Sequence, residues 1–393
     1  MASESGDDSI EIDSALGEED AWRFEELPDQ AESEEIQLSD VKAPTRRVSE
    51  TEVKICQAEC EQRLVRASGA SHSDFNLLCG NLDAAHQGLV ILPDRLGSLA
   101  LRKLCLQDNA LCELPETIGN LSGLTELSVW QNRLTCLPHS IGCLEHLHTL
   151  LLWKNSLVSL PESIGQLQHL AILHLECNEI IQLPESMGNL RSLRVLHIWA
   201  NRLSALPESL GRLPDLHELH AERNCLRSLP DMSMPKLREV DLQDNCLESL
   251  PSLSLPRLRR LVLRCNRLTF FPPLQLPELE ELDVACNELS GLHPSVVDLP
   301  VRELRLENNF LVALPDQMGD MSRLSILHVE HNRLSDLPDM RNMVWLTSLF
   351  LEGNAFNEMP TCIQELLEAS GGSLYVEHDI IPMSSLHLVS QLK

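Results

Sequence analysis

The sequence predicts an α/β solenoid of about 13 repeats, in which short strands form one parallel sheet on the concave side. The first observation is a periodic asparagine, which recurs every 21 to 23 residues from Asn109 to Asn354. The second is the leucine pattern LxxLxLxxN, which each asparagine ends. The third is a proline-containing return such as LPxxIGxL, which follows the asparagine in many units. A unit of this length cannot bury its own leucines, so the units must stack.

Twelve units share the asparagine, and a degenerate unit with Gln87 in its place precedes them. The asparagines are Asn109, Asn132, Asn155, Asn178, Asn201, Asn224, Asn245, Asn266, Asn287, Asn309, Asn332 and Asn354. We expect each amide to turn inward after its strand, where it can bond the unpaired backbone of adjacent turns. This duty is structural and carries no catalytic chemistry.

The return segments predict two kinds of outer surface. The LPxxIGxL half of a unit should begin a brief helical turn on the convex side. In the units spanning 225–300 it becomes LPDMSMPKL, LPSLSLPRL and FPPLQLPEL. Two prolines so close together exclude an α-helix, because proline lacks a backbone N–H and clashes with the preceding turn. We therefore expect extended returns there.

The N-terminal part predicts a tail and a cap. Residues 1–52 carry 17 acidic against four basic side chains, and residues 1–48 show no periodicity, so we expect an acidic disordered tail over 1–48. Ser49 and Glu52 have the spacing of a capping box. Apolar residues then recur at helical intervals, so residues 49–81 should hold a helix that covers the first strand.

The solenoid itself is expected over residues 82–361, and residues 362–393 should form a C-terminal cap and tail. The stretch PTCIQELLEASGG predicts a closing helix that stops at Gly371. Residues 373–393 carry no pattern that we can assign.

Composition narrows the class of protein. The net charge of −28 argues against a nucleic acid or an anionic membrane as partner. The thirteen cysteines lack the spacing of a disulfide framework, which favours a reduced, intracellular protein. With no apolar run long enough for a signal peptide or a membrane span, we expect no membrane insertion and a cytoplasmic location, with the nucleus left open.

The quoted motifs resemble those of leucine-rich-repeat proteins, over roughly residues 82–361. The 23-residue LPxxIGxL unit is similar to the intracellular Ras-group class, which includes the repeat regions of Scribble-like scaffolds and plant intracellular Ras-group proteins. The resemblance implies a horseshoe that binds proteins, with a small GTPase or a phosphatase complex among the partners of such proteins. The double-proline units also resemble those of bacterial effector ligases, but the catalytic domain of those effectors has no counterpart in this sequence.

The outward positions of LxxLxLxxN are the third, fifth, seventh and eighth, because the inward leucines alternate with them. Three of the five tryptophans occupy the seventh position, so they should share the concave wall. An exposed aromatic patch of this kind is typical of binding hot spots, although neighbouring tryptophans can also simply stack along the sheet. The residues that we expect to bind a partner are Trp130, Leu151, Trp153, His174, Glu176, His197, Trp199, His220 and Glu222. Farther along, acidic and basic positions mix, which suits a partner with an apolar anchor and a basic flank.

Two clusters raise the question of chemistry. Three histidines, one on each of three adjacent strands, could hold zinc, but zinc sites need convergent geometry and supporting contacts. We expect a binding-face ladder instead, with no metal and no cofactor. Cys265 and Cys286 should be lateral neighbours, and we expect structural contacts rather than redox chemistry from them. Because no catalytic set stands out from the repeat-imposed residues, we do not expect an enzyme.

The sequence therefore predicts an intracellular adaptor or scaffold that grips a protein partner on the concave face. The alternative is a regulatory subunit of a phosphatase or small-GTPase signalling complex. Ser49 follows two arginines in RRVS and is a phosphorylation candidate, because a phosphate would add negative charge at the positive end of the predicted helix. The identity of the partner and the oligomeric state are left open.

Overall fold

The computed structural model describes most of the chain within the compact unit Ser49–Lys393. The described residues are 50–68, 79–358, 360–369 and 374–378. The predicted acidic tail over 1–48 lies outside them, and so does the phosphorylation candidate Ser49. Among the helices of this described part, none is long and apolar enough to cross a membrane.

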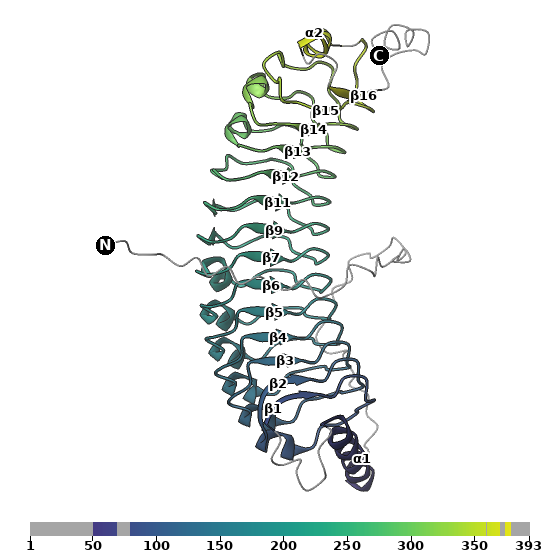
Figure 1. Cartoon of the computed structure of the whole chain (residues 1–393). Coiled ribbons are helices and arrows are strands. Elements are labelled where there is room, and N and C mark those ends of the chain that lie inside the picture. The colour runs from purple at the N-terminus through teal and green to yellow at the C-terminus, as the bar shows by residue number, and fades with distance from the viewer. Residues whose placement is uncertain (1–49, 69–78, 359, 370–373, 379–393) are drawn as a thin grey trace, which may run out of the picture. The chain divides into compact units, whose positions relative to one another are not determined.

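One parallel sheet of 14 strands forms the spine of the solenoid, and its strands follow one another in chain order (Figure 1). The strands are β1 (Cys79–Asp83), β2 (Ala100–Cys105), β3 (Glu126–Ser128), β4 (Thr149–Leu151), β5 (Ile172–His174), β6 (Val195–His197), β7 (Glu218–His220), β9 (Glu239–Asp241), β11 (Arg260–Val262), β12 (Glu281–Asp283), β13 (Glu303–Arg305), β14 (Ile326–His328), β15 (Ser348–Phe350) and β16 (Tyr375–Glu377). Equivalent positions of successive units pair without a shift from β3 to β15, as with Leu150 opposite Leu173. The predicted leucine-rich-repeat solenoid is confirmed.

The core is a continuous column of leucines along the inner face of the strands. Leu127, Leu150, Leu173 and Leu196 occupy the same position in successive units, and each is fully buried. Burying a leucine side chain contributes roughly 1.5–3 kcal/mol. Because each strand in this run is only three residues long, this stacked burial between units, rather than any single strand, stabilises the fold.

The asparagine of each unit closes the turn after the strand. In a representative unit, Asn178 Nδ2 donates to the carbonyl oxygens of Leu175 at 2.8 Å and of Leu152, in the preceding unit, at 3.1 Å. Its Oδ1 accepts from the backbone N–H of Leu157, also in the preceding unit, at 3.0 Å. The amide therefore joins two units through backbone groups that the sheet leaves unpaired, as the sequence predicted.

The residue before each asparagine adopts a left-handed backbone conformation, which the leucine pattern did not reveal. In the non-glycine cases φ lies between 52° and 56°. These residues are Asp108, Gln131, Lys154, Cys177, Ala200, Arg223, Asp244, Cys265, Cys286, Asn308 and His331, and Gly353 takes the same place with a φ of 69°. Their backbone N–H groups extend the ladder, as where Lys154 N donates to Glu176 O at 2.9 Å. The turn directs the next side chain, the asparagine, into the core.

The LPxxIGxL returns, and the return at residues 294–298, form 3-10 helices on the side of the stack opposite the asparagine turns (Figure 1). They are η2 (Asp94–Ser98), η3 (Glu116–Asn120), η4 (His139–Cys143), η5 (Glu162–Gln166), η6 (Glu185–Asn189), η7 (Glu208–Arg212), η8 (Pro294–Asp298) and η9 (Asp316–Asp320). The glycine of this motif is explained by close approach, because a Cβ on Gly142 would collide with the carbonyl oxygen of Ser163. Successive 3-10 helices therefore contact each other at backbone distance.

The double-proline returns are extended, as the prolines predicted. Residues of two such returns pair as short parallel strands, β8 (Met232–Ser233) and β10 (Leu253–Ser254). The third return, which contains Pro273 and Pro277, forms no helix either. The return surface thus changes from helical to extended in the middle of the solenoid.

Helices lie at both ends of the sheet (Figure 1). α1 (Glu50–Ser68) packs against β1, where Leu64 is fully buried and Arg63 Nη1 donates to the carbonyl oxygen of Gly88 at 2.6 Å. α2 (Thr361–Ala369) follows the last repeat and buries Ile363. The capping box predicted from Ser49 is not covered by the described residues and remains a prediction.

The strand β16 was not predicted. It lies in the stretch that the sequence left unassigned, and it pairs in parallel with β15. Its inward residues are Leu374, which is buried, and Val376, which packs against the core. Tyr375 and Glu377 alternate with them on the outer face. The period-2 alternation was present in the sequence but only over four residues, too few to separate from chance.

Candidate partner-binding face

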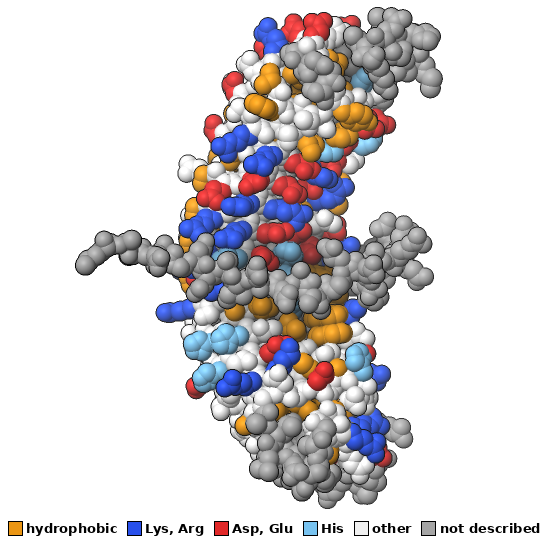
Figure 2. Space-filling model, viewed as in Figure 1, with side chains coloured by type: hydrophobic (Ala, Val, Ile, Leu, Met, Phe, Trp, Pro, Cys, Tyr) orange, Lys and Arg blue, Asp and Glu red, His pale blue; other side chains and the backbone are white. Residues whose placement is uncertain are grey.

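The predicted partner-binding residues lie together on the face of the sheet that points away from the leucine core, which we call the outer face. All nine come from the strands β3 to β7 or from the two residues after each strand. Eight of the side chains are half-buried, and Glu176 is the buried exception. Four of them are apolar, Trp130, Leu151, Trp153 and Trp199, and we call these four the aromatic block. Figure 2 shows hydrophobic side chains gathered over the rungs near β4 and β5.

Two of the three tryptophans form a stacked pair. The rings of Trp130 and Trp153 lie 4.2 Å apart between centroids, with an angle of 9° between planes. Trp199 is separated from them, because Glu176 occupies the equivalent position on the intervening strand. Lys154 Nζ lies 5.2 Å from the centroid of the Trp153 ring. The pair gains stacking energy within the chain, while Trp199 has no aromatic neighbour of this kind among the residues that the structure describes.

The three histidines form a stacked ladder beside the tryptophans. The ring centroids of His174 and His197 are 4.3 Å apart, and those of His197 and His220 are 4.5 Å apart. His174 Nδ1 lies 3.3 Å from Glu176 Oε1. Burial, together with the two flanking imidazoles, lowers the pKa of His197 to about 3. The central ring is therefore neutral at physiological pH.

Glu222 lies beside the histidine ladder, in surroundings that disfavour the charged form of its carboxyl group. Burial raises its pKa to about 7, and the nearby carboxylates of Asp241 and Glu176 add to the shift. Its Oε2 atom is buried and has no hydrogen-bond partner among the described residues. Near neutral pH this group exists as a mixture of charged and neutral forms, and a donor or a cation from a partner would favour the charged form.

Beyond the ladder the face becomes a mosaic of opposite charges. Arg260 bridges two strands, with Nη1 donating to Glu239 Oε1 at 2.7 Å and Nε donating to Glu281 Oε2 at 3.1 Å. Arg305 Nη2 lies 2.6 Å from Glu303 Oε1. Figure 2 shows acidic and basic side chains interleaved over the strands from β9 to β13. Glu239, Glu281 and Glu303 therefore already have arginine partners within the chain.

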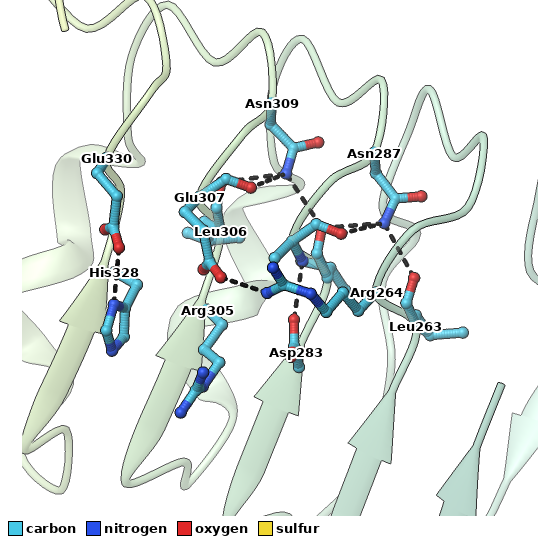
Figure 3. A network of polar contacts seen from close by, with 12 residues as sticks. Leu263, Arg264, Asp283, Asn287, Arg305, Leu306, Glu307, Asn309, His328 and Glu330 are labelled. Atoms are coloured by element: carbon cyan, nitrogen blue, oxygen red, sulfur yellow. Dashed lines mark hydrogen bonds and ion pairs between the residues drawn. The ribbon is translucent and has the colours of Figure 1, made fainter. Parts of the chain in front are cut away.

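An acidic pocket of about 320 Å³ follows the mosaic at the C-terminal end. Its lining residues are Arg264, Glu307, Asn308, Glu330, His331, Phe350, Glu352 and Glu377. Four carboxylates thus meet a single guanidinium, and Arg264 Nη1 donates to Glu307 Oε1 at 2.6 Å (Figure 3). Glu307 is only 7% exposed, and its Oε2 has no partner among the described residues. The pocket carries uncompensated negative charge.

Aromatic rings form one wall beside this pocket. Phe350 stacks on His328, with centroids 4.1 Å apart and an angle of 4° between planes. Tyr375 lies 5.9 Å from Phe350 and is 56% exposed. The sequence pattern predicted mixed charges on this part of the face, but it missed the contribution of Phe350 and Glu377. The latter could not be placed because it comes from the unpredicted strand β16.

The cysteine pair shows no sign of reactivity. Cys265 and Cys286 lie on adjacent turns and both are free thiols. Burial, together with the neighbouring Cys286, raises the pKa of Cys265 to about 12. The thiolate is the nucleophile and the metal ligand, so Cys265 is unreactive near neutral pH.

Three groups on this face bring metal-ligating atoms within 4.8 Å of one another, counting only the described residues. The groups are His174 with Glu176 and His197; His197 with Glu218 and His220; and Glu307 with His328 and Glu330. The first and second share His197. All three mix imidazole with carboxylate, which is a donor set that suits zinc.

Comparison with known proteins identifies the fold. A leucine-rich-repeat region is matched over residues 93–269. The chain is similar to a leucine-rich-repeat protein of Leptospira interrogans, with 26% identity and a TM-score of 0.59 over 81% of this chain and 98% of that one. It is also similar to the ectodomain of the Arabidopsis receptor kinase HAESA in complex with a peptide hormone, with 25% identity and a TM-score of 0.58 over 79% of this chain and 58% of that one.

An internalin of Listeria monocytogenes shares the fold, at 18% identity and a TM-score of 0.55 over 83% of this chain and 96% of that one. No curated protein matches the sequence. The repeat pattern, the sheet and these likenesses agree on a leucine-rich-repeat solenoid.

Proposed function

We propose that this leucine-rich-repeat protein is an adaptor that binds an extended segment of a protein partner along the outer face of its sheet. The observation that carries the proposal is the aromatic block. Trp153 and Trp199 stand on the face opposite the leucine column, so the core does not require their bulk. Solvated tryptophans in register are costly unless a partner covers them, and such residues are frequent anchors of protein interfaces.

The acidic pocket supplies the second contact of the proposed complex. A pocket with four carboxylates and one arginine, flanked by Phe350 and Tyr375, suits an arginine or lysine side chain of the partner. Such a cation would pair with the Oε2 atom of Glu307, which lacks a partner within the described chain. The partner would thus combine an apolar anchor with a basic residue.

The likeness to a receptor ectodomain in complex with a peptide hormone supports this use of the fold, since the same architecture holds a peptide there. The proposal concerns binding, so it assigns no reaction to the chain.

A regulatory subunit of a phosphatase or small-GTPase signalling complex is the narrower alternative. The 23-residue LPxxIGxL units support it, because they are similar to those of the intracellular Ras-group class. That class would make the protein cytoplasmic, a scaffold in signal transduction. Purifying the full chain from its native cells and identifying the bound proteins distinguishes the two, since the alternative requires a phosphatase or a GTPase among them.

The test of the proposed surface is the loss of an identified partner on truncation of the aromatic block. Trp153→Ala and Trp199→Ala should each weaken partner binding by about 2–4 kcal/mol, or roughly 30-fold or more, with little change in thermal midpoint. Affinity is measured by titration of the purified partner, and folding by circular dichroism.

Trp345→Ala is the matched control. Trp345 is 67% exposed and precedes β15, so it lies off the proposed face. Equal affinity for all three variants and the native chain would rule out the aromatic block as the binding surface. A large fall in the stability of Trp153→Ala would instead mean that the stacked pair serves the fold.

Phosphorylation of Ser49 is a further part of the proposal. Two arginines precede it, as basophilic kinases prefer, and α1 begins at the next residue. A phosphate there would place negative charge at the positive end of the helix and stabilise it. A purified basophilic kinase that labels a control peptide but not Ser49 would contradict this.

A further inference from the structure

The ladder of histidines carries a feature that partner binding does not explain. One ring nitrogen of His197, one of His220 and one carboxylate oxygen of Glu218 all lie within 4.8 Å of one another. The three side chains come from adjacent strands, β6 and β7, whose register places His197 directly opposite His220. We propose that these three residues form a zinc site on the sheet.

Two ring nitrogens of this group make no hydrogen bond within the described chain. The Nε2 atoms of His197 and His220 are both buried, and neither has a hydrogen-bond partner. A buried polar atom without a partner costs about 1–3 kcal/mol, so two of them side by side mark a place where something else should bind. A zinc ion would accept both lone pairs at once.

The carboxylate of Glu218 has no ion-pair partner among the described residues. Glu218 faces Glu239 directly across β7 and β9, which places like charges opposite each other. Arg260 serves Glu239, at 2.7 Å from its Oε1. No described side chain pairs with Glu218 in the same way. A divalent cation beside Glu218 would relieve this repulsion.

The register of the sheet brings the two imidazoles together, because His197 on β6 lies directly opposite His220 on β7. The two rings are stacked, with centroids 4.5 Å apart and 20° between planes, so their in-plane lone pairs run side by side. A shared ion therefore requires the rings to rotate until both nitrogens point at it. Ligands of a tetrahedral zinc lie roughly 3.3 Å apart, so the donor atoms must also close by up to about 1.5 Å, which rotation of the side-chain torsion angles allows.

Two imidazoles and one carboxylate leave the fourth position of a tetrahedral zinc for water or for a partner's side chain. A further carboxylate, Glu239 Oε1, lies 3.7 Å from His220 Nε2, but Arg260 already engages it. The site is therefore of the open kind. It would sit between the aromatic block and the charge mosaic.

The other two groups are weaker candidates, because their histidines lie closer to a carboxylate than His220 does. His174 Nδ1 is 3.3 Å from Glu176 Oε1, and His328 Nδ1 is 2.9 Å from Glu330 Oε1. In the last group Arg264 also occupies Glu307, which a metal would have to displace. In the group on β6 and β7 the two Nε2 atoms make no hydrogen bond among the described residues, and the carboxylate of Glu239 lies 3.7 Å from His220 Nε2.

The experiment is a titration of the metal-free full-length chain with Zn²⁺ alone, in competition with a chromophoric chelator. We expect one tight zinc per chain, and Co²⁺ in its place should give the visible bands of a tetrahedral site. His197→Ala, His220→Ala and Glu218→Gln should each weaken zinc binding roughly tenfold or more. Glu218→Gln keeps the size of the side chain, so it tests the site even if a histidine variant folds poorly.

His146→Ala is the matched control, because His146 is exposed and lies before its strand, off the ladder. It should bind zinc as the native chain does. Absence of saturable zinc binding would overturn the proposal, and so would equal losses in the control. If His174→Ala lost as much affinity as His220→Ala, the ion would belong to the neighbouring group and this assignment would be wrong. No partner is present in the assay, so its outcome is independent of the proposed adaptor function.

Discussion

Single residues set the stability of this fold through backbone groups rather than through side-chain contacts alone. The amide of Asn178 makes hydrogen bonds to the backbone of its own unit and of the preceding one. The residue just before each asparagine adopts a left-handed backbone conformation. This holds even for Ala200, whose side chain cannot make the local hydrogen bond that favours this conformation for Asn or Asp. The asparagine and the turn are therefore one device, repeated along the solenoid.

Replacing this amide should be costly. Asn178→Ala leaves the buried Leu157 N–H without its partner and removes one of two amide donors from each of two carbonyl oxygens. We therefore expect a loss of about 1–3 kcal/mol in the free energy of unfolding. Denaturant titration followed by circular dichroism measures it. Asn189→Ala, on the exposed end of η6, removes the same side chain from the surface and should have little effect. An unchanged midpoint for Asn178→Ala would show that the turn does not depend on the amide.

Glu222 gives the protein a pH dependence whose sign follows from its environment. Its pKa in the folded chain is about 7, above the ordinary value of 4.5, so the folded state holds the proton more tightly. Its contribution to stability is present below about pH 4.5 and is lost as the pH rises through 7.

Glu222→Gln mimics the protonated form and should therefore be more stable than the native chain at about pH 8, by roughly 1–2 kcal/mol after allowance for solvent screening. Near pH 4.5 the two proteins should be alike. Denaturant midpoints at both pH values measure the difference, and Glu145→Gln on an exposed return controls for the lost charge. A constant difference at both pH values would contradict the argument.

At the scale of the element, the return segment decides how closely units can stack. The 3-10 helices touch where the motif has its glycine, and the extended returns touch through β8 and β10 instead. Gly142 sits at such a contact, because a Cβ there would meet the carbonyl oxygen of Ser163. A side chain at this position must push two returns apart.

Gly142→Ala should therefore destabilise the fold by about 1–3 kcal/mol, through overpacking between η4 and η5. Gly123→Ala is the control, since a Cβ on Gly123 would lie 3.5 Å from its nearest neighbour, an ordinary contact. Thermal midpoints of the two variants make the comparison. Equal midpoints would mean that neighbouring returns can separate without cost.

The sequence predicted those elements that the repeat period governs. Strand positions, inward leucines, the asparagine turn and the extended double-proline returns all follow from patterns repeated many times in one chain. The features that the sequence did not predict either occur only once or do not depend on the type of side chain. β16 is a single short strand, and the left-handed turn accepts residues as different as Lys154 and Ala200, so no residue preference announces it.

On the candidate binding face, too, the features that follow the repeat period were predicted from the sequence, and the others were not. The register of Trp153, His197 and Glu222 on one surface follows from the period alone, and the structure places them there. The acidic pocket depends on Glu377 from β16, and on the ring of Phe350 stacking over His328. Neither can be read from a repeat, because both require knowledge of which segment lies next to the last unit.

Across the whole solenoid, each unit contacts its neighbours and little else, so the surface is divided into regions by position along the chain. The aromatic block ends at the unit of β6, the histidine ladder reaches β7, the charge mosaic runs from β9 to β13, and the acidic pocket closes the series. A partner that touches two of these regions must span the units between them.

The regular spacing of the strands fixes the distance between the aromatic block and the acidic pocket. From Trp153 on β4 to Glu330 after β14 the sheet has eight steps, which at about 4.8 Å per step is roughly 38 Å. An extended peptide covers that distance with about 11 residues, at roughly 3.3–3.6 Å each. If one rigid segment bridges both regions, the protein selects its partner by length as well as by chemistry.

Deleting residues 225–245 would remove one unit, keep the asparagine register, and leave both the aromatic block and the acidic pocket intact. The aromatic block and the acidic pocket would then be one strand spacing closer together. A partner that bridges both regions should bind roughly tenfold more weakly, because it can no longer engage them together. An unchanged affinity after the deletion would show that the partner does not bridge the two regions.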